Sequence, residues 1–297
     1  MKKLYPFSFH RKRRTINFKS IVSAAVLLLG GKELAYAQVS SYTFSQSSGT
    51  YAPITGTVLD TATGNTSTTN LNSNIYPLSL PFGFVFNGVS YNSLNVSTNG
   101  FITFGSTAPS TTYTTPVSGT TAYEGAVSVF GRDLSSFFDI SGATGDISWE
   151  TTGTAPNREI VIQWKNFRPN SSTSTTAVYT FSFQIRLKET SNVIEMVYNN
   201  GSYLAGSTSV SGTAQIGLRG ASATDFNTRL NGTSLEFVNS IPGTANSSTQ
   251  AFNTVNAIPG MPSAGLTYTW TPPTCFAPSG ITSGTTTNNS VNISWTP

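Results

Sequence analysis

The stretch from Val89 to Gly105 constrains the fold most, because it contains two short apolar runs joined at Asn99-Gly100. An Asn-Gly pair between such runs favours a two-residue hairpin turn, since both residues tolerate the positive φ angles of a type I′ turn. This turn would pair Thr98 with Phe101. The strand faces would then hold Leu94, Val96 and Phe101 on one side, and Ile102 and Phe104 on the other. A second strand that is apolar on both faces indicates a hairpin inside a multi-sheet body, or a turn longer than two residues.

Short apolar runs separated by turn residues recur from residue 41 to residue 271, and none shows helical spacing over more than two turns. The chain contains 19 Phe, 12 Tyr and 4 Trp, which provide ample apolar area for a core. The clearest long hairpin pairs residues 178–188 with residues 193–198. About a dozen strands at this spacing predict an all-β fold, a large antiparallel β-sandwich or jelly-roll-like domain over residues 38–271.

The first 37 residues have the three parts of a signal peptide. Basic residues continue to Lys19, an apolar run covers residues 21–29, and Ala35-Tyr36-Ala37 places small residues where signal peptidase cleaves. The apolar run is too short for a membrane helix, which needs about 20 residues. We therefore expect residues 1–37 to be removed, and the mature chain to be secreted without a transmembrane segment.

The charge and the histidine content exclude several classes of function. Residues 38–297 carry eight basic and eleven acidic side chains, so the net charge of the whole chain, +4, becomes −3 after residue 37. The basic residues are scattered, which predicts no nucleic-acid partner. His10 is the single histidine, so a mature chain without residues 1–37 has no Ser-His-Asp site and no histidine-ligated zinc. We expect a non-enzyme; a glycosidase that uses carboxylates such as Asp133 and Glu159 stays the remaining catalytic alternative.

The character of the chain changes after Trp270. Residues 272–274 form a proline-rich linker, and Cys275 has no second cysteine with which to pair. Residues 275–297 resemble the opening of a fibronectin type III domain, with an alternating strand of Val291, Ile293 and Trp295. Such a domain has about seven strands, so we expect an incomplete copy and further domains after it in the full-length protein.

The main body also resembles a known family. The segments that carry the resemblance are residues 42–44 (YTF), 81–86 (PFGFVF), 96–101 (VSTNGF), 131–134 (GRDL), 155–166 and 183–198. They are similar to the amino-terminal β-sandwich of secreted, modular surface proteins of Flavobacterium-like Bacteroidetes, and distantly to the nidogen-type extracellular domain. The resemblance implies export and cell-surface attachment or release, often through type IX secretion. It assigns no activity.

Oxygen donors cluster between residues 133 and 146. Asp133, Asp139 and Asp146 lie in a glycine-containing segment, which predicts a calcium site; calcium is the single cofactor that we consider. The alternative is a turn-rich connection in which the Asp side chains cap backbone N–H groups. Separately, Asp60-Thr61-Ala62 resembles the bacterial O-glycosylation pattern, which makes Thr61 a candidate glycosylation site.

Three tyrosines are the candidate ligand contacts. Tyr113, Tyr123 and Tyr203 lie in polar loops, where we expect an exposed contact surface. We assign Trp149 and Trp164 to the core rather than to sugar stacking, because each alternates with polar neighbours. We assign Arg132 and Arg158 to structural ion pairs.

These observations predict an exported, non-enzymatic cell-surface or extracellular module with a structural or adhesive role, which binds a glycan or a protein. The alternative is an accessory module, for substrate binding or spacing, of a larger secreted hydrolase. The domains that follow in the full-length protein would separate the two.

Overall fold

The computed structural model describes residues 38–232, 234, 236–255, 260–273, 279–286 and 291–296 of the 297-residue chain. The predicted signal peptide, Cys275 and the last linker residue lie outside the described residues. Contacts divide the chain into two units, of which residues 36–276 form one and the segment from residue 277 belongs to the other.

The strands of the larger unit are β1 Thr43–Ser48, β2 Thr57–Thr61, β3 Ile75–Phe86, β4 Val89–Ser97, β5 Phe101–Phe104, β6 Ala126–Gly131, β7 Asp146–Thr152, β8 Glu159–Phe167, β9 Val178–Lys188, β10 Ile194–Tyr198, β11 Ser202–Ala205, β12 Ser211–Arg219, β13 Phe226–Leu230, β14 Ile241–Pro242, β15 Gln250–Asn253 and β16 Leu266–Thr271. Two short 3-10 helices, η1 Val39–Ser41 and η2 Phe237–Asn239, accompany them. The other unit contains one antiparallel hairpin, β17 Ser279–Thr286 and β18 Val291–Thr296.

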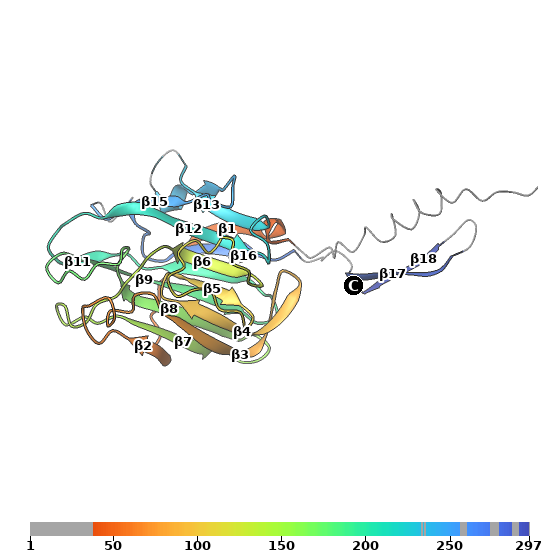
Figure 1. Cartoon of the computed structure of the whole chain (residues 1–297), viewed down its shortest axis with the longest axis horizontal. Helices are drawn as coiled ribbons and strands as arrows, with labels where there is room; N and C mark the ends of the chain where they lie inside the picture. The colour runs from red at the N-terminus through yellow and green to blue at the C-terminus, as the bar shows by residue number, and fades with distance from the viewer. Residues whose placement is uncertain are drawn as a thin grey trace, which may run out of the picture. The chain divides into compact units, whose positions relative to one another are not determined.

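Two eight-stranded antiparallel sheets build the larger unit (Figure 1). Sheet A has the order β1-β16-β10-β9-β8-β7-β2, with β11 beside β9. Sheet B has the order β14-β13-β12-β6-β5-β4-β3, with β15 beside β12. The predicted all-β sandwich is confirmed, and side chains from both sheets share one hydrophobic core.

Alternation of apolar and polar residues explains why these segments form strands. On β3, five apolar side chains from Leu78 to Phe86 are buried, and the residues between them are exposed or half-buried. Pro77 and Pro81 are tolerated because β3 is an edge strand of sheet B. On β8, Ile160, Ile162 and Trp164 enter the core as predicted, and Trp164 Nε1 donates to the Ser97 carbonyl at 2.9 Å.

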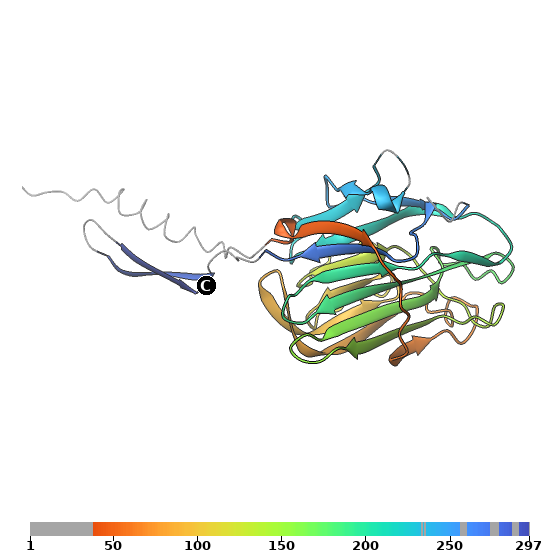
Figure 2. The same ribbon diagram turned by 180° about the vertical axis from the view of Figure 1, so that it is seen from behind.

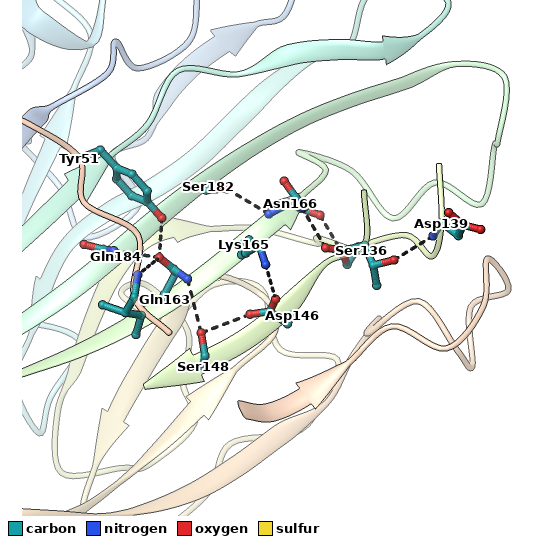
Figure 3. Close-up of polar contacts among 12 residues, drawn as sticks. Tyr51, Ser136, Asp139, Asp146, Ser148, Gln163, Lys165, Asn166, Ser182 and Gln184 are labelled. Carbon is teal, nitrogen blue, oxygen red and sulfur yellow. Dashed lines mark hydrogen bonds and ion pairs between the residues drawn. The ribbon is translucent and has the colours of Figure 1, made fainter. Parts of the chain in front are cut away.

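The outer face of sheet A is covered by residues 49–56, which lie between β1 and β2. Gln163 and Gln184 point to this face, yet both are fully buried. Gln163 Oε1 accepts from the Tyr51 hydroxyl at 3.0 Å (Figure 3) and from the Ile54 backbone at 3.1 Å. Gln184 Nε2 donates to the Ala52 carbonyl at 2.8 Å. Burial raises the pKa of Tyr51 far above its ordinary value. The covering segment therefore replaces water for the polar side chains beneath it.

The turn between β4 and β5 corrects the predicted hairpin. Ser97 pairs with Phe101 and Val96 with Ile102, so the turn contains three residues and the pairing is shifted by one. Gly100 has φ +75°, and its carbonyl accepts from two backbone N–H groups of β6, at Val129 and Phe130. A three-residue turn with a glycine in the left-handed region gives this geometry. The faces change accordingly: Leu94, Val96, Ile102 and Phe104 join the core, and Phe101 points to the other side.

The first and last strands of the domain are neighbours. β1 pairs with β16 along its whole length, with Thr43 opposite Thr271 (Figure 2). Four strands were not predicted from the sequence, namely β11, β13, β14 and β15. The strand predicted at residues 235–238 is wrong in its described part, because Phe237 begins the 3-10 helix η2.

Candidate ligand-binding groove

A polar groove of about 560 Å³ opens where the end of β6 meets β12. Four separate segments line it: residues 114–118, residues 131–133, residues 212–215 and residues 247–249. We call it the Arg132 groove. Its lining side chains are Thr114, Thr115, Ser118, Arg132, Asp133, Thr213, Gln215, Ser247 and Thr249.

Arg132 is the cation of this groove. Its guanidinium carbon lies 4.6 Å from the centre of the Phe252 ring, and its Nε donates to the Asp133 carbonyl at 3.3 Å. Burial lowers the pKa of Arg132, and the charge of Asp133 opposes this effect. Gly212 makes room for the group, because a Cβ there would lie 2.5 Å from Arg132 Nη1.

Neither terminal nitrogen of Arg132 has a hydrogen-bond partner in the part of the chain that the structure describes, and Arg132 forms none of its ion pairs. The structural ion pair predicted for Arg132 is therefore wrong, whereas the one predicted for Arg158 is confirmed, with Glu189 at 2.6 Å. The exposed Asp133 carboxylate is also unpaired among these residues. The Arg132 guanidinium, a hydrogen-bond donor, and the Asp133 carboxylate, an acceptor, thus both line the groove without a side-chain partner among the described residues.

The loop of residues 106–125 forms one wall, and β12 holds it in place. Gln215 Oε1 accepts from Val117 N at 2.9 Å, and its Nε2 donates to the Ser118 hydroxyl at 2.6 Å. Arg219 donates to the carbonyls of Gly119 and Thr121, both at 2.9 Å. Gln215 is 4% exposed and Arg219 2% exposed, so buried contacts fix this wall before any ligand binds.

The three candidate tyrosines do not form the expected exposed surface. Tyr123 is buried, with the guanidinium of Arg219 4.3 Å from its ring centre, so the expectation of exposure is wrong there. Tyr113 is half-buried and packs edge-on against Tyr123 and Phe101. Tyr203 lies on β11, packs edge-on against Tyr179 and bonds to the Thr254 hydroxyl at 2.8 Å. Tyr113 and Tyr123 both belong to the loop that forms a wall of the Arg132 groove, and the Tyr123 hydroxyl donates to the Pro116 carbonyl within it.

The structure does not bring Asp133, Asp139 and Asp146 together. Asp146 pairs with Lys165 at 3.1 Å and accepts from Ser148, whereas Asp139 lies apart from it and bonds through its backbone N–H to the Thr144 hydroxyl (Figure 3). No group of three or more Asp, Glu, His or Cys side chains suited to a metal occurs among the described residues. Calcium binding by these residues stays a prediction without a ligand cluster to support it.

Thr61, the candidate glycosylation site, is exposed at the end of β2. Its backbone N–H donates to Asp60 Oδ1 at 2.8 Å, and Asp60 Oδ2 accepts from the Tyr76 hydroxyl at 2.6 Å. The side chain of Thr61 is thus presented on an ordered strand.

Sequence reasoning singled out the segment GRDL and the loop after Gly105 but did not join them. The contribution of β12 and of residues 247–249 was missed. The sequence offers one signal, the isolated Arg-Asp pair at residues 132–133 in a chain with few charges.

The fold and the groove define an antiparallel β-sandwich domain that carries a polar groove among its loops. The model of the NIDO-related family matches residues 41–272, so the chain belongs to this family. No match was found among curated proteins or among solved structures. In the described part of the chain, no helix has both the length and the apolar character to span a membrane.

Proposed function

We propose that this chain is an extracellular, non-catalytic module that binds a glycan in the Arg132 groove. The observation that carries the proposal is the pair of opposite charges at its centre, the Arg132 guanidinium with two unpartnered terminal nitrogens beside the exposed Asp133 carboxylate, among the described residues. Membership of the NIDO-related family supports the extracellular setting. Asp133 is the single acid among the residues that line the groove, which favours binding over a mechanism with two carboxylates.

Sugars present neighbouring hydroxyl groups that donate and accept hydrogen bonds. Arg132 supplies donors and Asp133 supplies acceptors, and the surrounding hydroxyls can do both. The charges of the pair cancel, so a neutral glycan suits the groove better than a polyanion. Because the wall is already held by Gln215 and Arg219, binding costs little ordering of the loop.

A glycan array probed with the purified chain, with and without calcium, tests this function. Arg132→Ala should weaken binding of the selected neutral glycan about tenfold or more. Gly212→Ala should do the same without removing a charge, because its methyl group would displace Nη1. Lys165→Ala, which removes a cation from the outer face of sheet A, is the matched control and should bind normally. Unchanged binding by both groove variants, or no binding to any glycan, would contradict the proposal.

We further propose that the module is exported through a cleaved signal peptide of residues 1–37 and carries a glycan on Thr61. The exposure of Thr61 on an ordered strand supports the second point. Amino-terminal sequencing of the secreted protein should begin at Gln38, and a mass increase should appear on the peptide that contains Thr61. A secreted protein that keeps residues 1–37, or an unmodified Thr61 peptide, would refute the corresponding point.

A further inference from the structure

A second groove, of about 630 Å³, lies between β1 of sheet A and the strands β13 and β14 of sheet B. Tyr42 and Phe44 form one wall, and Phe226 and Arg229 belong to the other, with Pro242 and Gly243 at its margin. We call it the Arg229 groove. It shares no residue with the Arg132 groove, so its role is independent of the function proposed above.

Arg229 is 4% exposed and carries the positive charge of this groove. Its Nε donates to the Ser240 hydroxyl at 3.1 Å and its Nη2 to the Ser240 carbonyl at 2.5 Å. The third nitrogen, Nη1, has no hydrogen-bond partner among the described residues. Nη1 is not fully buried, and Arg229 lines the groove, so this nitrogen faces the groove. The nearly buried Arg229 guanidinium therefore presents a free N–H donor to a ligand in the groove.

No acid of the described chain neutralises Arg229. The four ion pairs of these residues use other side chains. Asp225, four residues earlier, is turned toward Asn87 Nδ2 at 3.1 Å and the Ser40 backbone at 3.4 Å. The groove therefore keeps an excess positive charge that a carboxylate of a ligand would complement.

The cation lies directly against an aromatic surface. The Arg229 guanidinium carbon is 3.7 Å from the ring centre of Phe44, and the Phe44 ring packs edge-on against Trp270 at 5.1 Å. Phe44 is half-buried, so it offers apolar area to the groove. A ligand for this site must carry its anionic and apolar groups a few ångströms apart. The last residue of a peptide meets this requirement, because its carboxylate and its side chain share one Cα.

We propose that the Arg229 groove binds the carboxyl terminus of a partner polypeptide whose last residue is aromatic or large and aliphatic. The terminal carboxylate accepts from Nη1 of Arg229, and the terminal side chain packs against Phe44. Binding is non-covalent and leaves the Ser240 contacts of Arg229 in place.

A matched pair of dipeptides tests the proposal on the whole purified chain. N-acetyl-Gly-Phe with a free carboxylate should bind with a dissociation constant on the order of 1 mM by titration NMR or calorimetry. The corresponding carboxamide should bind about tenfold more weakly, because it lacks the anion. Equal affinity for the acid and the amide, or no saturable binding of the acid, would overturn the proposal without any mutation.

Two variants locate the site. Phe44→Ala and Arg229→Gln should each weaken binding of the free acid about tenfold, whereas Arg132→Ala should leave it unchanged. Phe44 and Arg229 are at least half-buried, and if either variant does not fold, the dipeptide pair decides. Full affinity in a folded Phe44→Ala variant, or equal loss in Arg132→Ala, would place the dipeptide elsewhere and refute the assignment.

Discussion

Asn99 shows how one buried amide joins segments that are separate in the sequence. Its Oδ1 accepts from Leu134 N at 3.1 Å, and its Nδ2 donates to the carbonyls of Thr111 and Tyr113 at 3.3 and 3.1 Å. The turn, the segment GRDL and the loop of the Arg132 groove therefore meet at this side chain, which is fully buried. An amide in such a position leaves unsatisfied groups behind when it is removed.

Asn99→Ala should lower the free energy of unfolding by about 3 kcal/mol, because Leu134 N and two carbonyls lose a partner that water cannot replace. Asn65→Ala is the control: its amide also makes two backbone bonds, to Phe138, but at a half-exposed position. Its cost should stay below about 1 kcal/mol. Urea unfolding measures both, and similar losses would show that Asn99 has no special role.

Glu189 provides a prediction about pH. Its carboxylate accepts two hydrogen bonds from the Arg158 guanidinium, at 2.8 and 2.6 Å, and a third from the Arg158 backbone at 3.0 Å. The side-chain bonds from Arg158 hold the pKa of Glu189 at about 2, below its ordinary 4.5. A lowered pKa stabilises the fold fully above the ordinary value, and this contribution is lost as the pH falls toward the lowered value.

Glu189→Gln should therefore be less stable than the parent at pH 7, and the difference should shrink between about pH 4.5 and pH 2. Arg158→Gln removes the partner and should show a similar loss at pH 7. Thermal unfolding across this pH range gives the measurement. A difference that stays constant down to pH 2 would contradict the coupling.

At the scale of elements, two Asn-Gly pairs in one strand ribbon behave differently. Asn87 and Gly88 have φ angles of 53° and 79°, and Phe86 pairs with Val89, so this pair makes a two-residue turn. Asn99-Gly100 lies in a three-residue turn. The Gly100 carbonyl accepts hydrogen bonds from β6, and the Asn99 side chain bonds to the neighbouring loops, and these contacts favour the longer turn. The local turn rule is sound, and tertiary hydrogen bonds decided its outcome at residue 99.

Gly100→Ala and Gly142→Ala separate backbone strain from steric contact. Both glycines have φ +75°, but a Cβ at residue 100 would lie 2.4 Å from the Phe130 carbonyl oxygen, whereas at residue 142 it would meet nothing within 4 Å. We expect a loss of about 1 kcal/mol for Gly142→Ala and of about 3 kcal/mol or more for Gly100→Ala. Chemical denaturation compares them, and equal losses would mean that β6 moves freely away from the turn.

For the whole molecule, β16 closes the domain. It lies between β1 and β10 and contributes the buried side chains of Leu266, Tyr268 and Trp270 to the core. Residues 277–297 belong to the other unit. The sandwich should therefore need residue 271 but not the hairpin of β17 and β18.

A chain that ends at Pro273 should unfold cooperatively, with a midpoint within a few degrees of the full chain. A chain that ends at Gly265 should lose cooperative unfolding, because two strands and one face of the core lose their neighbour. Circular dichroism during heating distinguishes the two. Cooperative unfolding of the shorter chain would show that β16 is dispensable.

The amino-acid sequence alone determined the all-β class, the sandwich and most of its strands, because burial on one face of a strand requires side chains that alternate with period two. It also pointed to the NIDO-related family through short motifs. It missed β11, β13, β14 and β15, which are short. The partners of each strand and both grooves were decided by tertiary structure. Residues 114, 132, 213 and 249 meet in one groove because long-range packing brings their segments together. No local sequence pattern specifies contacts between segments so far apart in the chain.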